Sequence, residues 1–158
     1  FSVEPLSWRR ELGLSYGVDH AIDVTGAEAV NAVNDMTGGI GADLVVEAVG
    51  STETLSEAFH FVRDEGSVVL FGLPESEDPV PFDYSQMFKS RANAFTVLGS
   101  QDEVGLKSYA EALHLISRGK IDVAPIISHR VNITEIDRAF EVARERVDGA
   151  VKIGVTFD

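Results

Sequence analysis

The chain has 158 residues, 44% of them hydrophobic, which suits a single globular domain with its own core. Its formal net charge of −13 disfavours binding to nucleic acid or to an anionic membrane, because such binding needs Lys and Arg. No apolar run reaches the roughly 20 residues that span a bilayer, and no segment resembles a secretion signal, so we expect a cytoplasmic protein. The absence of cysteine excludes disulfides, a thiolate zinc site and a cysteine nucleophile.

Apolar runs alternate with segments of helical period along the first half of the chain. We expect strands at 1–3, 21–24 and 42–49, and helices at 8–16, 27–36 and 52–62, the first of them capped by Ser7. The run Leu44, Val45 and Val46 is too apolar for a strand with one wet face, so it predicts a central strand that is buried on both faces.

The same alternation continues in the second half. A turn at 64–66 leads into a second buried strand at 67–71, and an acidic loop with prolines follows at 75–81. We then expect a strand at 95–98, an amphipathic helix at 104–116, a strand at 126–131, a helix at 135–144 and a last strand at 151–157. This order of elements predicts the α/β class, with a doubly wound, mainly parallel sheet.

Glu4 is the first candidate for ligand binding. In a dinucleotide-binding sheet, an acidic residue at the end of the second strand accepts hydrogen bonds from the adenosine ribose and repels the additional phosphate of NADP. Glu4 follows directly on the strand that ends at Val3. The alternative is a solvated loop residue.

Small residues follow two of the predicted strands. Val49, Gly50 and Ser51 come after one strand, and Gly72 and Leu73 come after the next. The carboxyl ends of parallel strands meet at the ligand crevice, where small residues let a cofactor approach the backbone. The alternative for each glycine is ordinary turn chemistry.

No catalytic or metal-binding residue is indicated. The four histidines show neither the i, i+4 spacing nor the clustering with carboxylates that a metal site needs. The chain also has no Gly-x-Ser-x-Gly elbow and no phosphate loop ending in Gly-Lys-Ser or Gly-Lys-Thr, so hydrolase and nucleotidase functions lose support.

A series of short motifs runs along the chain. They are Val3-Glu4-Pro5 with Arg9, 17–23, 37–43, Glu47-Ala48-Val49-Gly50, 66–74, Gly119-Lys120-Ile121-Asp122, Ser128-His129-Arg130, Glu135-Ile136 and Ala139-Phe140-Glu141. Taken together, these motifs resemble the medium-chain dehydrogenase/reductase superfamily over essentially the whole chain. The segments 47–50 and 128–130 resemble its zinc-type alcohol, threonine and polyol dehydrogenases more than its zinc-free quinone reductases.

The resemblance implies a Rossmann-like, NAD-binding domain and a role for each matching position. Glu4 would hold the adenosine ribose, with Arg9 beside it and Val49 and Ser51 lining the wall. Gly72 and Leu73 would lie along the nicotinamide. Gly99 and Ser100 would meet the nicotinamide amide, and Lys152 would lie near the pyrophosphate.

The resemblance also implies that parts of the family pattern are absent. Its first strand, its Gly-x-Gly-x-x-Gly turn and the domain with the zinc ligands have no counterpart here, so we expect a fragment that is inactive alone and binds NAD weakly or not at all. Residues 1–125 would form a partial NAD-binding domain. Residues 126–158 would return to the catalytic domain, which leaves Phe140 and Phe157 partly exposed. The parent enzyme would transfer hydride between NAD and an alcohol or polyol.

Losing a central strand would leave a gap between the strand that ends at Val3 and the strand at 42–49. Open edges invite strand pairing, so we expect either direct closure of the sheet or pairing between protomers of a homo-oligomer. Two alternatives to the dehydrogenase hypothesis stay open. One is a non-catalytic nucleotide-binding or oligomerisation module, and the other is part of a zinc-free quinone or enoyl reductase.

Overall fold

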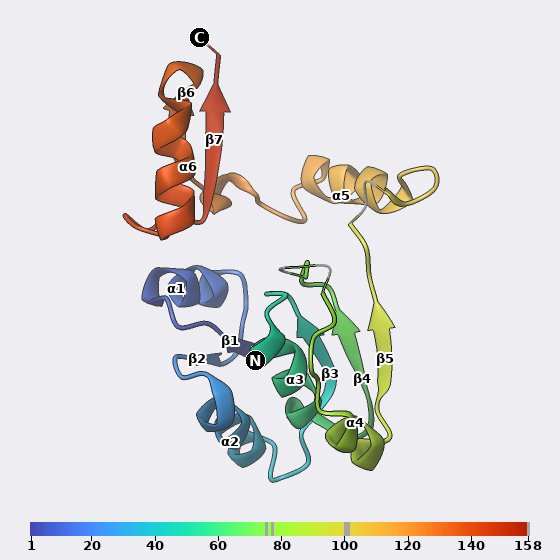
Figure 1. Ribbon diagram of the computed structural model, residues 1–158. Coiled ribbons are helices and arrows are strands. Elements are labelled where there is room, and N and C mark those ends of the chain that lie inside the picture. Colours follow the sequence, from blue (N-terminus) through green and yellow to red (C-terminus); the bar gives the residue numbers. More distant parts are fainter. Residues whose placement is uncertain (75, 77, 100–101, 158) are drawn as a thin grey trace.

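All strand pairs among the described residues are parallel. The structure is a computed structural model that describes residues 1–74, 76, 78–99 and 102–157. Helices connect the successive strands (Figure 1), so the predicted α/β class with mainly parallel strands is confirmed. Across these ranges, no helix combines the length and the apolar character needed to cross a membrane.

The N-terminal unit is a small βαβα arrangement. It consists of β1 (Ser2–Val3), α1 (Ser7–Ser15), β2 (Ala21–Ile22) and α2 (Gly26–Met36), with β1 paired to β2. The buried residues Ile22, Ala29 and Val33 form its core. The predicted cap of α1 is wrong, because Ser7 is the first helical residue and Leu6 occupies the cap position.

The central unit is a three-stranded sheet in the order β3-β4-β5. Its elements are β3 (Ala42–Glu47), α3 (Thr52–Phe61), β4 (Val62–Leu70), α4 (Tyr84–Ser90) and β5 (Asn93–Thr96). Phe59 and Val68 are fully buried between α3 and the sheet, and Met87 of α4 packs against the same cluster. α4 was not predicted from the sequence. Its N-terminus is capped by Asp83, whose side chain accepts a hydrogen bond from the Gln86 N–H at 2.9 Å.

The prediction that β3 is buried on both faces is wrong. Val45 packs against the core, but the side chains of Leu44 and Val46 are 58% and 55% exposed. Alternate side chains of a strand point to opposite faces, and α3 and α4 contact the face that carries Val45 and Val68. Leu44, Val46 and Phe95 are therefore on the opposite, largely uncovered face.

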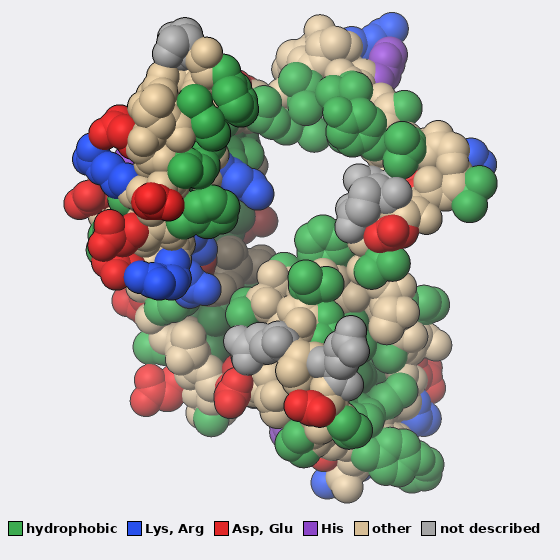
Figure 2. Space-filling model, turned by 45° about the horizontal axis from the view of Figure 1, so that its top comes forward, with side chains coloured by type: hydrophobic (Ala, Val, Ile, Leu, Met, Phe, Trp, Pro, Cys, Tyr) green, Lys and Arg blue, Asp and Glu red, His purple; other side chains and the backbone are tan. Residues whose placement is uncertain are grey.

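The predicted direct closure of the sheet is also wrong for the single chain. The described strands form three separate sheets, and β1 is not paired with β3. The N-terminal and central units are joined through helices instead, because Phe61 of α3 packs against the core beneath α2. Figure 2 shows an opening through the middle of the molecule, with hydrophobic side chains on its rim. Strand pairing between protomers stays a prediction.

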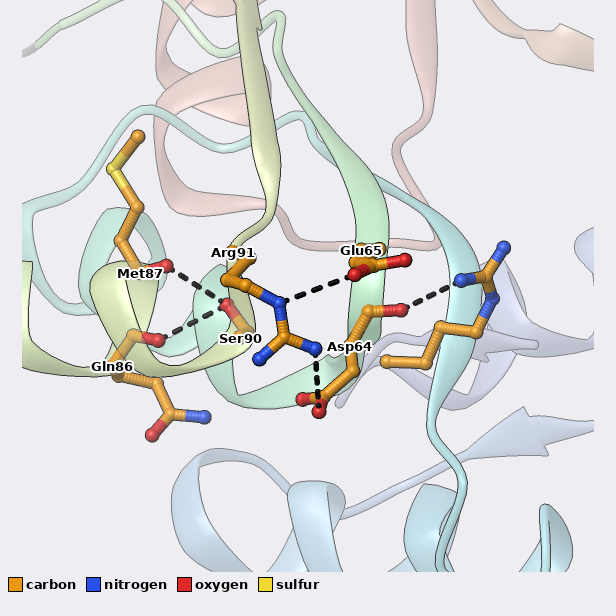
Figure 3. Close-up of polar contacts among 7 residues, drawn as sticks. Asp64, Glu65, Gln86, Met87, Ser90 and Arg91 are labelled. Atoms are coloured by element: carbon orange, nitrogen blue, oxygen red, sulfur yellow. Dashed lines mark hydrogen bonds and ion pairs between the residues drawn. The ribbon is translucent and has the colours of Figure 1, made fainter.

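A bulge replaces the turn that we predicted at 64–66. β4 runs without a break from Val62, but its register with β3 jumps from Ala42↔Val62 to Leu44↔Ser67. Glu65 takes a left-handed φ of 61° at this point. Figure 3 shows Arg91, which follows α4, reaching the carboxylates of Asp64 and Glu65 at 3.3 and 3.2 Å. These exposed ion pairs contribute little to stability.

The C-terminal part contains a second helical connection and a third sheet. Its elements are α5 (Lys107–Ser117), the 3-10 turns η2 (Ala124–Ile126) and η3 (Ile133–Glu135), β6 (Ile127–Asn132), α6 (Ile136–Glu145) and β7 (Lys152–Thr156). β6 pairs with β7, and α6 buries Ala139 and Val142. Figure 1 shows α5 lying away from the central sheet. Phe140 and Phe157 are exposed, as predicted.

The core position of Phe59 gives a direct test of this fold. We expect Phe59→Ala to lower the free energy of unfolding by about 3–5 kcal/mol, because it removes a fully buried ring and leaves a cavity. Urea unfolding followed by circular dichroism measures the change. The matched control is Phe140→Ala, whose ring is 71% exposed. Equal losses in the two variants would contradict the assigned core.

Candidate nucleotide-binding site

The loops after β3 and β4 lie in backbone contact with each other. A Cβ atom on Gly50 would overlap the carbonyl oxygen of Leu73, and a Cβ atom on Gly72 would overlap the Gly50 nitrogen. Gly50 also has a φ of 92°, which favours glycine. The structure thus brings together two predicted groups of residues, and the close approach of the two backbones explains both glycines.

Glu47, at the end of β3, connects these two loops. Its backbone carbonyl accepts hydrogen bonds from the N–H groups of Phe71 and Gly72 at 2.8 and 2.9 Å. Its side-chain Oε1 accepts from the N–H groups of Val49 and Gly50, both at 2.8 Å. Glu47 was not among the predicted site residues, although it belongs to the Glu47-Ala48-Val49-Gly50 motif. The available signal was a carboxylate directly after an apolar strand and before small residues.

The other predicted residues of these loops differ in what they contact. Ser51 caps α3, where its hydroxyl accepts a hydrogen bond from the Thr54 N–H at 3.2 Å. Val49 and Leu73 are exposed apolar side chains. A flat ring could pack against such side chains. Ser51 stabilises the start of α3, whether or not it also contacts a ligand.

Glu4 and Arg9 form a second group of predicted residues, beyond the end of β1. Oε1 of Glu4 accepts a hydrogen bond from the Leu6 N–H at 2.9 Å, and Oε2 lies 4.0 Å from Nη1 of Arg9. The Glu4 side chain is partly exposed, and its carboxylate can accept further hydrogen bonds. Nη2 of Arg9 donates to the Ala150 carbonyl at 3.3 Å, which links α1 to the segment that leads into β7.

Lys152 and Arg9 line the same cavity. The cavity has a volume of 410 Å³, and its other walls come from α6 and from residues 150–155. The structure therefore joins Lys152 to the Glu4 and Arg9 group. Gly99 follows β5, and its carbonyl accepts a hydrogen bond from the Asp102 N–H at 3.1 Å. Ser100 lies outside the described residues.

No metal centre can be built from the side chains that the structure describes. Within these ranges, no group of three or more His, Asp or Glu residues is close enough to hold a metal ion. His60 lies 3.2 Å from Asp83, and His129 contacts the Ser128 hydroxyl at 2.9 Å. The described side chains therefore do not fit a zinc site.

The hydroxyl of Ser51 also acts on a neighbouring carboxylate. Hydrogen bonds, first from the Glu53 backbone and then from Ser51, lower the pKa of Glu53 below its usual value. A carboxylate whose pKa is lowered by folding stabilises the folded chain at pH values above its usual pKa. This stabilisation is lost as the pH falls through the lowered pKa.

We expect Ser51→Ala to raise the pKa of Glu53 toward its usual value, because one of the two donors is lost. NMR titration of the Glu53 side chain measures this pKa. Ser56→Ala, later in the same helix, is the control and should leave the pKa of Glu53 unchanged. Identical titration curves for Ser51→Ala and the unsubstituted chain would show that Ser51 does not act on Glu53.

Comparison with known proteins identifies related sequences and folds. The family model described as zinc-binding dehydrogenase matches residues 1–118. The L-threonine 3-dehydrogenase of Pyrococcus abyssi is 30% identical over 149 residues, which cover 94% of this chain and 42% of that protein. The chain spans about two fifths of the length of such curated relatives.

Solved structures agree with the sequence relatives. Alcohol dehydrogenase TADH from Thermus sp. ATN1 has a TM-score of 0.82 at 25% identity, covering 99% of this chain and 43% of that one. An E. coli CFT073 alcohol dehydrogenase, solved with the cofactor NADH, shares the fold with a TM-score of 0.79 at 18% identity, covering 98% and 43%. The predicted resemblance is confirmed. Because the family model matches more than half of its residues, this chain belongs to the zinc-binding dehydrogenase family.

Proposed function

We propose that this chain is the NAD(H)-binding part of a zinc-type dehydrogenase that transfers hydride between the cofactor and an alcohol or polyol. The observation that carries the proposal is the pair of glycine loops, Gly50 against Gly72, at the carboxyl ends of two neighbouring parallel strands. Ligands of open α/β sheets bind at this end of the strands, where backbone without side chains leaves room for them.

In this proposal Glu4 recognises the adenosine ribose. Only one oxygen of its carboxylate accepts the Leu6 N–H, and the 4.0 Å separation from Arg9 is longer than a hydrogen bond. The carboxylate therefore has acceptor capacity for two ribose hydroxyls. Its negative charge would repel the additional phosphate of NADP, which favours NAD.

The remaining proposed contacts follow the two groups that the fold brings together. Arg9 and Lys152, which line one cavity, supply positive charge for the phosphates and the adenosine side. Val49, Ser51, Gly72 and Leu73 line the wall that faces the cofactor rings. Gly99 and Ser100 are proposed at the nicotinamide amide.

Catalysis requires groups outside this set, so we assign no catalytic residue here. A zinc ion in such an enzyme polarises the alcohol oxygen, and its ligands would come from another part of a longer protein. The division into residues 1–125 and 126–158 belongs to the same proposal, with support from the separate β6–β7 sheet. Cytoplasmic location and homo-oligomer formation remain predictions.

Calorimetric titration of the 158-residue chain with NADH tests the proposal. We expect weak but saturable binding, and we expect Glu4→Ala to raise the Kd by about 10- to 100-fold, because charge-assisted hydrogen bonds to the ribose are lost. Glu4→Ala should also reduce the preference for NADH over NADPH, since the repulsive carboxylate is gone.

Glu11→Ala is the matched control for this titration, because Glu11 is an exposed carboxylate on α1. It should bind NADH as the unsubstituted chain does. A Kd that is the same in all three proteins would remove Glu4 from the site. No binding in any of them would contradict nucleotide binding by this chain.

A further inference from the structure

We infer that Glu47 is a positioning residue, whose side chain holds the loop after β3 against the loop after β4 in the shape that admits the cofactor. The inference rests on the proposed function for the identity of the ligand. The Glu47 side chain is 6% exposed at the carboxyl end of β3, where neighbouring strand residues are apolar. A buried carboxylate is costly unless hydrogen bonds compensate its lost hydration.

Three donors converge on one oxygen of this carboxylate. The N–H groups of Val49 and Gly50 and the hydroxyl of Thr54 each lie 2.8 Å from Oε1. Val49 and Gly50 belong to the loop after β3, and Thr54 belongs to the first turn of α3. Glu47 thus fixes the path of the chain between the end of β3 and the start of α3.

The loop after β4 contacts the same residue. Phe71 and Gly72 donate to the Glu47 carbonyl, and a Cβ atom on Gly72 would lie 2.5 Å from Oε2 of Glu47. The side chain therefore lies directly beside Gly72, in space that only glycine leaves free. The loop after β4 is thus bonded to the Glu47 backbone carbonyl, while the Glu47 side chain bonds Gly50 and lies against Gly72.

This arrangement predicts a local effect on the loops when Glu47 is changed. Glu47→Gln keeps an acceptor oxygen but loses the charge, whereas Glu47→Leu leaves both backbone donors without an acceptor. In the chain without cofactor, we expect native-state amide exchange at Val49 and Gly50 to accelerate by about 10-fold in Glu47→Gln and by about 100-fold in Glu47→Leu. Thr54→Val, which removes only the third donor, should have a smaller effect.

NADH affinity separates positioning from a general loss of stability. Val142→Ala is the control, because it opens a cavity under α6, which packs on the separate β6–β7 sheet. Calorimetry uses a temperature and a buffer in which every variant is fully folded, as shown by urea unfolding curves. We expect Glu47→Gln to raise the Kd for NADH by about 10-fold, and Val142→Ala to leave it unchanged.

Each result bears on a different claim. Unchanged exchange at Val49 and Gly50 in Glu47→Leu would overturn the inference, whatever NADH does. Accelerated exchange with an unchanged Kd would also overturn it, since the loops would then not shape the site. If the unsubstituted chain binds no NADH, the proposed function and the cofactor role of Glu47 both fail, while accelerated exchange would still establish its hold on the loops.

Discussion

The packing of α3 is the constraint on which most of this structure depends. Phe59 buries its ring against the central sheet, and Phe61, two residues later, packs against the core beneath α2. One helix thereby holds the N-terminal and central units together without strand pairing between them. The same helix begins at the glycine loops, where Ser51 caps it and Thr54 contacts Glu47. Loss of this packing would disturb the core and the candidate site together.

The candidate site combines two groups of residues with different chemistry. The glycine loops offer bare backbone and exposed apolar side chains, which suit the flat rings of a dinucleotide. Glu4, Arg9 and Lys152 offer charge, and the contact of Arg9 with Ala150 links them to the C-terminal sheet. Membership in the zinc-binding dehydrogenase family supports the proposal that these residues bind a dinucleotide. Among the described residues, no group of three or more His, Asp or Glu side chains could hold a metal ion.

Local patterns were sufficient to predict most elements of this fold. The helices at 27–36 and 52–62 were predicted to within a residue of α2 and α3, because their apolar residues recur at helical spacing. The motif that follows β3 located one glycine loop, and the end of β4 located the other. α4 was missed because its seven residues are too few for a clear period. The prediction of a turn at 64–66 was wrong, because a glycine near a strand is typical of a bulge as well as of a turn.

The sequence by itself determined the α/β class, the family and the two glycine loops, because these depend on periodicity and on short motifs within one stretch of chain. Only the tertiary structure decided which surfaces are covered. It left Leu44 and Val46 exposed, divided the strands into three sheets, and joined Lys152 to Arg9 across more than 140 residues. It also buried Glu47 in contact with both glycine loops. Burial and long-range contacts depend on the relative placement of distant segments, which local patterns do not contain.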